Sequence, residues 1–402
     1  MGTVLIVKLA HLADLHLGFR QYTRQTAQGI NQREADVANA FRRAVDGVVA
    51  AAPDVVLVAG DIFHTVRPTN PAILDSFNQF RRLHEAMPHV PIIVIAGNHD
   101  TPRSVETGTI LTLFEALPNI HAIVRGPTRL SFEDLDLSVL CVPDQAIRAS
   151  PRPAMEPEPG TRWNVLVTHG EVAGVVPGDR SFVEYGGALV EPGDLHADEW
   201  SYVALGHYHV AQQVTPNAWY AGSLEYVSTN PWGELGEAAR LGWGHPKGWL
   251  LATLREGNAA VEFMPIEMAR RHLDLSPIDG QGLEAAELDA LITQRVDGIA
   301  DGVDDQVIRQ VVTNVTRGVA RELNHAAIRD LKVRALHYHL DIRRPVVHQE
   351  VGVAAPGQRR TLDETVADYL ARRELTPGVE RDALVALGKH YLEQVEREQA
   401  EG

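Results

Sequence analysis

The sequence predicts an α/β protein: a β-sandwich flanked by helices, followed by a small α+β domain and C-terminal helices. Three observations support this fold class. Uninterrupted apolar runs rich in β-branched residues alternate with amphipathic helical patterns up to about residue 125. Strand-like runs dominate from residue 128, and the pattern changes again after about residue 270. Apolar runs without polar alternation are typical of a sheet that is buried on both faces.

The first sheet is predicted from three short apolar runs that end just before polar residues. The runs are VLIVKLA, DVVLVA and PIIVIA. Between the first two, apolar residues recur at helical spacing until Pro53; they are Val37, Phe41, Val45 and Val48. A second helix is predicted for PAILDSFNQFRRLHEA, with Pro71 near its start. Strands and amphipathic helices in this order predict a sheet that helices cover.

A second sheet is predicted from the strand-like runs after residue 128. They are LDLSVLCV, WNVLVTH, YVALGH, AWYAG, GWLLATL and AVEFMPI. Their layout suggests that this sheet packs on the first one as a sandwich. The proline-rich segment 143–162 is predicted to be a mobile surface loop. Cys141, the single cysteine, excludes an intrachain disulfide and is expected to be a small buried hydrophobic residue.

The changes in pattern predict four segments. Residues 1–269 are predicted to form the main domain, and residues 270–345 a small α+β domain. In the small domain, RHLDLSPI, QVIRQVVTNVT and ALHYHLDIRR are strand candidates, and LEAAELDALITQRVDGI and ARELNHAAIRDL are helix candidates. Residues 346–360 have the composition of a linker, and residues 361–402 are predicted to be helical.

Two amphipathic helices are predicted after the linker. Thr361 and Glu364 match the pattern of a capping box at the start of the first helix. The apolar stripes of the two helices are Leu362, Val366, Tyr369 and Leu370, then Leu384, Leu387, Tyr391 and Val395. These stripes have to be buried, either against the body of the chain or against a helix of a partner, and the residues alone leave both open.

Length and composition restrict the class of protein. With 402 residues and 45% hydrophobic content, the chain can bury a large core. The formal net charge of -16 argues against nucleic-acid binding by overall charge, although a local basic patch remains compatible with it. No run approaches the roughly 20 apolar residues of a membrane span, and the N-terminus lacks the basic start of a signal peptide. We therefore expect a cytoplasmic protein with no membrane segment.

Polar residues able to bind metals or move protons gather where the apolar runs end. The five clusters are Asp14 and His16 in DLHLG, Asp61 and His64 in GDIFH, Asn98, His99 and Asp100 in GNHD, His169 in VTHG, and His207 and His209 in GHYH. Ligands bind beyond the carboxyl ends of strands in sheets of this kind, so we expect the clusters to meet at one edge. His337 and His339 in LHYHL have the same spacing as the last pair but lack a preceding glycine and companion clusters. We predict that they form one face of an ordinary strand.

The mixture of residue types in the clusters fits two divalent metal ions. Imidazole nitrogens suit manganese, iron and zinc, and carboxylate and amide oxygens suit manganese well. Asp61 is the expected bridge, because a carboxylate has two oxygens and can contact two cations. Two cations about 3.5–4 Å apart can hold a hydroxide and clamp a phosphoryl group for in-line attack.

These motifs resemble those of the calcineurin-like metallophosphoesterases. The chain is similar to that family in DLHLG, GDIFH, GNHD, THG and GHYH, which span residues 14 to 209. His64, in GDIFH, makes the chain look like the SbcD-type DNA-repair exonuclease branch. The small α+β domain and terminal helices are similar in layout to the DNA-binding capping domain and partner-binding helices of that branch. The resemblance thus implies a metallophosphoesterase β-sandwich with 270–345 as capping domain.

The resemblance also implies a role for each site residue. Two divalent ions are implied, and manganese is the expected metal. One ion would be held by Asp14, His16, Asp61 and His209. The other would be held by Asp61, Asn98, His169 and His207. His99 would stabilise the transition state or protonate the leaving oxygen, and Asp100 would orient the other ring nitrogen of His99. His64 would contact the scissile phosphate.

Substrate and partners follow from the same resemblance. The chain is expected to hydrolyse phosphodiester bonds in DNA together with an SMC-like ATPase that docks on the helices at 361–397, and to form a homodimer. Arginines near the metal motifs could contact DNA phosphates; they are Arg20, Arg24, Arg33, Arg67 and Arg103, of which Arg20, Arg67 and Arg103 are the main candidates. Trp232 and Trp243 are expected to pack in the core or in an ordered loop rather than stack on bases.

Two other interpretations remain open at this point. The chain could be another phosphoesterase of the same fold that acts on phosphoproteins or small phosphodiesters; His64 and the C-terminal extension argue against this. It could also be an interaction scaffold that has lost activity, but such a protein is expected to have lost metal ligands, and this sequence retains the full set.

Overall fold

The computed structural model describes residues 6–102, 108–175, 186–243, 247–256, 259–345, 362–372 and 380–400. The chain divides into two compact units, Met1–Arg344 and Pro345–Gly402. None of the described helices is long and apolar enough to cross a membrane. The predicted linker 346–360 and Thr361 lie outside the described residues.

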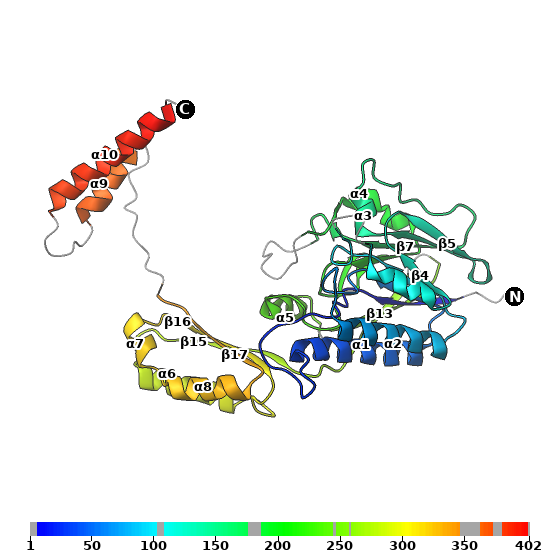
Figure 1. Ribbon diagram of the computed structural model, residues 1–402, viewed down its shortest axis with the longest axis horizontal. Helices are drawn as coiled ribbons and strands as arrows, with labels where there is room; N and C mark the ends of the chain where they lie inside the picture. The colour runs from blue at the N-terminus through cyan, green and yellow to red at the C-terminus, as the bar shows by residue number, and fades with distance from the viewer. Residues whose placement is uncertain are drawn as a thin grey trace. The chain divides into compact units, whose positions relative to one another are not determined.

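The first unit is built around two six-stranded sheets (Figure 1). The strands of the first sheet are, in spatial order, β14 (Ala260–Pro265), β13 (Gly248–Leu254), β1 (Val7–Leu12), β2 (Val55–Ala59), β3 (Ile92–Ile95) and β4 (Ile120–Ile123). Those of the second sheet are β11 (Gln212–Thr215), β12 (Ala218–Tyr220), β10 (Tyr202–Gly206), β7 (Trp163–His169), β6 (Leu137–Val142) and β5 (Thr128–Phe132). A further pair joins β8 (Glu171–Val172) and β9 (Leu189–Val190).

The two sheets pack face to face, which confirms the predicted sandwich. One apolar cluster contains residues of both sheets, such as Leu57 and Ile93 from the first and Val165 and Tyr202 from the second. Cys141 is buried in the same cluster, as expected. The prediction was wrong in one respect: β13 and β14 do not extend the second sheet. β13 instead pairs antiparallel with β1, with Leu9 opposite Ala252. Apolar runs alone do not indicate which neighbour a strand will choose.

Helices cover the outer face of the first sheet. α1 (Gln32–Ala51) and α2 (Asn70–Ala86) lie side by side against it (Figure 1). Asn31 caps α1 and Thr69 caps α2, because each side chain accepts a backbone amide of the first turn. Phe41 and Phe80 meet in the core below, with ring centroids 5.4 Å apart. Shorter helical segments complete the unit: η2 (Ile110–Ala116), η3 (Glu133–Leu135), α3 (Asp144–Ile147), α4 (Pro192–Leu195), η4 (Ala197–Glu199) and α5 (Pro231–Arg240).

The segment 143–162 has more structure than its proline content suggests. It opens with α3, and Asp144 is buried rather than on the surface. The Trp232 region also differs from a loop, because α5 begins at Pro231 with Asn230 as its N-cap. Both short helices bring a carboxylate toward the end of a strand, as described below.

Residues after 270 form a three-stranded parallel sheet in the order β15 (His272–Asp279), β16 (Val307–Thr313) and β17 (His337–Ile342). α6 (Ala285–Asp297) and α8 (His325–Arg334) lie on one face of this sheet (Figure 1). Where the sequence pattern predicted one helix, the structure has two, α7 (Arg317–Glu322) and α8. The break lies at Leu323, and Asn324 caps α8 by accepting from the amide of Ala327 at 3.1 Å. The domain boundary at 269/270 remains a prediction.

The segment between β1 and α1 connects the sandwich to this small sheet. Arg24 donates to the carbonyl oxygen of Ala335 at 2.8 Å and forms an ion pair with Asp305. The ring of Tyr22 stacks on His337 with centroids 4.1 Å apart. Within the first unit, the loop that follows β1 therefore contacts the small sheet directly.

The second unit contains α9 (Leu362–Arg372) and α10 (Arg381–Ala400), as the sequence predicts. The two helices pack closely, since a Cβ added at Gly388 would lie 2.6 Å from Leu370. Tyr369, Leu387 and Tyr391 are each at least half exposed. Part of the predicted apolar stripe is therefore accessible on the described residues.

Candidate metal centre

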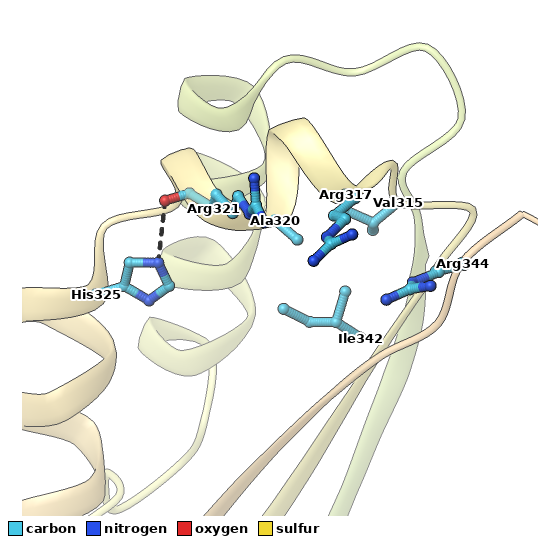
Figure 2. Close-up of a pocket in the computed structure, with 7 residues that line it drawn as sticks. All are labelled: Val315, Arg317, Ala320, Arg321, His325, Ile342 and Arg344. Carbon is cyan, nitrogen blue, oxygen red and sulfur yellow. Dashed lines mark hydrogen bonds between the residues drawn. The ribbon is translucent and has the colours of Figure 1, made fainter. Parts of the chain in front are cut away.

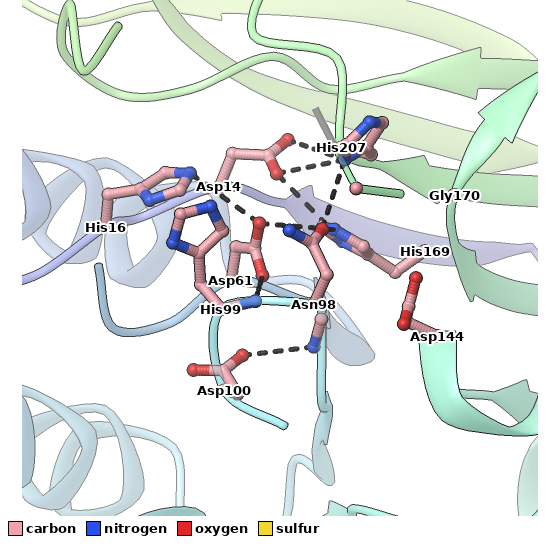
Figure 3. Close-up of polar contacts among 12 residues, drawn as sticks. Asp14, His16, Asp61, Asn98, His99, Asp100, Asp144, His169, Gly170 and His207 are labelled. Carbon is pink, nitrogen blue, oxygen red and sulfur yellow. Dashed lines mark hydrogen bonds and ion pairs between the residues drawn. The ribbon is translucent and has the colours of Figure 1, made fainter. Parts of the chain in front are cut away.

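The polar clusters predicted from the sequence meet at one edge of the sandwich (Figure 3). β1, β2 and β3 run parallel, so their carboxyl ends lie together. In the second sheet, β7 and β10 also run parallel and pair Gly206 with His169. Each cluster lies at the end of one of these strands or just beyond it. The ring of His169 reaches across to the first sheet, where its Nδ1 lies 2.8 Å from the carbonyl oxygen of Ala59.

One group of side chains is formed by Asp14, His16 and His209. Their candidate ligand atoms all lie within 4.8 Å of one another, and all three residues are buried. The Nε2 atoms of His16 and His209 are 3.1 Å apart. The carboxylate of Asp14 accepts the backbone amide of His207 at 2.9 Å, which ties the end of β1 to the end of β10. Converging imidazole nitrogens beside a carboxylate form a donor set suited to a divalent transition metal.

A second group is formed by Asp61, His169 and His207, again within 4.8 Å and buried. Asn98 adds an amide oxygen to this group. Its Oδ1 lies 3.0 Å from Nε2 of His169 and 3.2 Å from Nδ1 of His207. Nitrogen and oxygen donors thus surround a second position of the same chemical kind.

Asp61 lies between the two groups (Figure 3). Its Oδ2 is 3.2 Å from Nε2 of His169 and 3.7 Å from Nε2 of His16. Its Oδ1 accepts the backbone amide of His99 at 2.9 Å. Oδ2 is fully buried, and among the described residues its side-chain neighbours are these two imidazole rings, neither of which donates a well-aligned hydrogen bond to it. A buried carboxylate oxygen without a hydrogen bond normally costs free energy, and a cation shared by both groups would satisfy it. The residues present therefore fit two divalent ions bridged by Asp61.

Electrostatics distinguish the two aspartates of the site. Burial acts to raise the pKa of Asp61, but His169 and then His16 and His99 hold it well below its usual value. Burial raises the pKa of Asp14 to about 6. Burial acts to lower the pKa of His169, but Asp61 and then Asp14 raise it to about 10. Without a cation, the site therefore keeps a proton on His169 as its counter-charge, and metal binding is expected to release that proton.

The backbone at the site is held in conformations that ordinary residues avoid. Asp14, His16, Asp61 and His207 have φ angles of 51°, 44°, 51° and 105°. Non-glycine residues in this region cost on the order of 1–3 kcal/mol each and cluster at functional sites. Gly97 is required by close packing, because a Cβ there would lie 2.1 Å from Oδ1 of Asp61. The geometry around Asp61 therefore depends on both strain and the absence of a side chain.

His99 and His64 lie next to the first group, and the structure corrects the role expected for Asp100. Nδ1 of His99 lies 2.6 Å from the carbonyl oxygen of His64, and not against Asp100. The carboxylate of Asp100 accepts the backbone amides of Ile62, Phe63 and Gly97 at 3.0–3.1 Å. Burial raises the pKa of Asp100 to about 7. Asp100 therefore staples the turn after β3 to the turn after β2, and acts on His99 only through the backbone.

Two carboxylates near the site were not identified from the sequence. Glu234, in α5, has Oε1 3.7 Å from Nδ1 of His209 and forms an ion pair with Lys247, and both charges are fully buried. Glu234 thus places a buried carboxylate behind the ring of His209, at a distance that suits an ion pair rather than a hydrogen bond. The only sequence signal was a short helix pattern after Asn230, and no spacing rule connects it to β10.

Asp144 is the second of these carboxylates and supports the other group. It forms an ion pair with Arg148 at 2.6 Å and accepts the amide of Ala188 at 2.8 Å. The neighbouring Gly187 packs so closely on His207 that an added Cβ would lie 2.4 Å from Nε2. Asp144 therefore holds the backbone that covers the His207 ring.

The arginines predicted as phosphate contacts differ in their exposure and in their partners. Arg20 is exposed, with its Nε 3.5 Å from Glu34, and Arg67 is also exposed. Arg103 lies outside the described residues. Arg33 cannot contact DNA, because its side chain is fully buried and paired with Asp36 and Glu225. Arg24 is occupied by the small sheet, as described above.

Comparisons with known proteins place this architecture in context. Residues 7–211 match the calcineurin-like phosphoesterase family. A DNA double-strand break repair protein Mre11 of Sulfolobus acidocaldarius is 27% identical over 205 residues, covering 50% of either chain. The Mre11 protein of Methanopyrus kandleri is 26% identical over 298 residues, covering 69% of this chain and 60% of that protein. That of Methanocaldococcus jannaschii is 34% identical over 105 residues, covering 26% of each.

The chain spans about half the length of the first curated relatives that it matches. The matched segment runs from β1 to just beyond His209, so it contains all the side chains of both groups. The family match covers half of the sequence together with the whole candidate centre, and the chain therefore belongs to the calcineurin-like phosphoesterase family.

Proposed function

We propose that the chain is a nuclease that hydrolyses phosphodiester bonds of DNA with two divalent metal ions. Manganese is the proposed metal at both positions. The observation that carries this proposal is the convergence of two donor groups on Asp61 at the carboxyl edge of the sandwich. The relatives named Mre11 DNA double-strand break repair proteins support DNA as the substrate and repair as the setting.

The two groups divide the ligands. Asp14, His16 and His209 would hold one ion, and Asn98, His169 and His207 the other, with Asp61 shared between them. Ions bound in this way would supply an activated water and neutralise charge on the phosphoryl group. Proton transfer and contacts with the substrate would depend on side chains of the protein.

His99 is proposed to handle the proton of the leaving group. Its Nδ1 donates to the carbonyl oxygen of His64, which fixes the ring and makes Nε2 the atom that gains or releases a second proton. His64 is half-buried, with its Nδ1 3.2 Å from Nδ1 of His16, and would contact the scissile phosphate. Asp100 supports both residues by fixing the two turns that carry them.

DNA contacts and partners belong to the same proposal. Arg20, Arg67 and Arg103 would contact the phosphates next to the scissile bond, and the domain at 270–345 would cap the DNA. The segment 361–402 would dock an SMC-like ATPase, and the exposed Tyr369, Leu387 and Tyr391 supply an apolar face for this purpose. The chain is expected to act as a homodimer.

The test is cleavage of labelled duplex and single-stranded DNA with manganese, for wild type and His99→Ala. Bis-p-nitrophenyl phosphate is assayed in parallel, because it reports metal-centre chemistry without DNA binding. His339→Ala is the matched control, since His339 is an exposed histidine in β17 outside both groups. We expect wild type and His339→Ala to degrade DNA, and His99→Ala to lose the activity while still binding metal.

The other outcomes separate the alternatives. If wild type cleaves the small ester but not DNA, even with the ATPase partner added, the chain is another phosphoesterase of this family. If neither substrate is cleaved although calorimetry shows two bound manganese ions, the chain is a scaffold. Either result would contradict the proposal.

A further inference from the structure

A second site is indicated at the small sheet, away from the metal centre. A pocket with a volume of about 370 Å³ opens where β16 and β17 end (Figure 2). Val315 and Arg317 follow β16, and Arg344 follows β17. The three strands of this sheet are parallel, so the ends of β16 and β17 lie at the same edge. The pocket thus lies at the carboxyl edge of the small sheet.

The polar lining of the pocket is positively charged. Arg317, Arg321 and Arg344 contribute guanidinium groups, and His325 lies at the rim beside Arg321. Figure 2 shows the ends of Arg317 and Arg344 directed toward the space beside Ile342. Within the described part of the chain, none of these three guanidinium groups forms an ion pair with a carboxylate. Other arginines of the same sheet do, since Arg309 pairs with Asp274 and Arg343 with Asp341.

The charge of this region runs against that of the whole chain. Residues 315–344 contain seven Arg or Lys and three Asp or Glu, a formal balance of 7 − 3 = +4, whereas the chain carries -16. Three cations at one pocket in an acidic protein indicate an anionic ligand, and the planar guanidinium is suited to bidentate contacts with phosphate oxygens.

The volume and lining of the pocket limit which anions it can bind. A volume of about 370 Å³ is at the lower end of small-molecule sites, which are about 300–1,000 Å³. A space of this size can hold a single nucleotide. A phosphomonoester carries about -1.5 to -2 charges at neutral pH, more than each phosphodiester of a DNA backbone, and matches three cations better. Val315, Ala320 and Ile342 add apolar surface for a sugar or base, and guanidinium planes can stack on bases.

We propose that this pocket binds the phosphomonoester of a nucleotide, either a free mononucleotide or the phosphorylated end of a DNA strand. The proposal rests on the proposed function for the choice of a nucleotide, because a nuclease both meets and produces phosphorylated ends. It assigns Arg317, Arg321 and Arg344 as the phosphate contacts. The role of the pocket is to hold an end that the metal centre is not cutting.

The test measures binding of the full chain in EDTA, so that no cation at the metal centre holds phosphate. Fluorescence anisotropy compares a labelled single strand carrying a 5′-phosphate, a 3′-phosphate or hydroxyl ends only. Calorimetry compares deoxyadenosine monophosphate with deoxyadenosine. We expect the phosphorylated form to bind about tenfold tighter or more, as charge-assisted hydrogen bonds predict. Preference for the strand over the mononucleotide identifies a DNA end as the ligand, and equal affinity identifies the mononucleotide; either supports the proposal.

The matched variants are Arg317→Gln, Arg344→Gln and Arg343→Gln. The first two should abolish the preference for the phosphorylated form. Arg343→Gln should retain it, because Arg343 is adjacent in sequence but engaged with Asp341. Thermal melts confirm that each variant is folded. The proposal is overturned if phosphorylated and hydroxyl ends bind equally, if Arg343→Gln is as damaging as the other two, or if a phosphoserine peptide or inorganic phosphate binds as tightly as the nucleotide.

The binding test and the nuclease test can fail separately. Cleavage of DNA by wild type without any preference for phosphorylated ends would remove the pocket proposal and leave the function intact. A phosphate preference lost in Arg317→Gln, in a chain that cleaves no DNA, would do the reverse.

Discussion

The chain contains two His-x-His pairs with the same spacing and opposite surroundings. His207 and His209 are almost fully buried, come after the end of β10, and include a residue with φ of 105°. His337 and His339 lie inside β17, where His337 is partly buried against Tyr22 and His339 is exposed, with their rings stacked 6.0 Å apart. Spacing alone gives both pairs a common face. The end of a buried strand, with a glycine before it and other clusters nearby, is what turns such a face into a metal site.

The largest expected difference between the pairs is in catalysis. His207→Ala should lower manganese-dependent hydrolysis of bis-p-nitrophenyl phosphate by more than about 100-fold, because loss of groups that merely orient a ligand already costs about 10–100-fold. His339→Ala should leave the rate within twofold and the stability within about 0.5 kcal/mol of wild type. Equal rates in the two variants would remove the distinction between the pairs.

A second difference is the buried support behind His209. Glu234→Gln should lower the free energy of unfolding by about 3–5 kcal/mol, because it leaves the buried charge of Lys247 without its partner. The double variant Glu234→Gln with Lys247→Met should recover much of that stability. It should still bind manganese about 10–100-fold more weakly, because the carboxylate behind the ring of His209 is gone. Urea melts and calorimetry measure the two effects, and normal metal affinity in the double variant would contradict the role of Glu234.

A smaller effect is expected from the glycine beside Asp61. Gly97→Ala should cost about 1–3 kcal/mol of stability, since the new methyl group overlaps Oδ1 of Asp61. Gly126→Ala is the control, because a Cβ at that position has no neighbour within 4 Å. Thermal melts of both variants in EDTA test this. A Gly97→Ala protein as stable as the control would mean that the turn can move away from Asp61.

The last effect is absent at neutral pH and appears only in acid, and it concerns a histidine of the core. Burial lowers the pKa of His11 to about 3, against 6.5 for the unperturbed group, and its Nδ1 lies 2.9 Å from the hydroxyl of Tyr202. Between about pH 3 and 6.5, His11 therefore binds a proton in the unfolded chain but not in the folded chain. The stability that the neutral, buried ring allows is fully present above about pH 6.5 and is lost as the pH falls toward 3. His11→Gln should reduce the slope of stability against pH in that window by up to about 1.4 kcal/mol per pH unit. Urea melts in EDTA measure the slope, and an unchanged slope would show that His11 is not a buried neutral group.

Much of the fold could be predicted because each element has a local cause. The strands of the sandwich core are uninterrupted apolar runs, and α1 and α2 have helical periodicity with capping residues in front. The break between α7 and α8 was missed because helical periodicity continues across Leu323. Packing in the folded chain, and not the local pattern, determines that the segment forms two helices. The return of β13 to the first sheet was missed for a related reason, since strand pairing is not encoded by the strand itself.

The candidate site was predictable as far as it lies at strand ends. Asp14, Asp61 and His169 follow apolar runs, and the carboxyl-edge rule brings them together. The surrounding support was not predictable in this way. Asp100 turned out to bind backbone amides, and Glu234 comes from a helix that no motif links to β10. Arg33 looked like a phosphate contact but is buried in an ion-pair network with Asp36 and Glu225, whose positions only the folded chain reveals.

The loop after β1 has a structural consequence. It includes His16, a residue of the candidate metal centre, and continues to Tyr22 and Arg24, which contact the small sheet. The backbone amide of His16 also donates to the carbonyl oxygen of Asp61 at 2.9 Å, which fixes this part of the loop against the end of β2. The positions of His16 and of the small sheet therefore depend on the same short segment of chain, so a substitution that rearranges this loop would affect both.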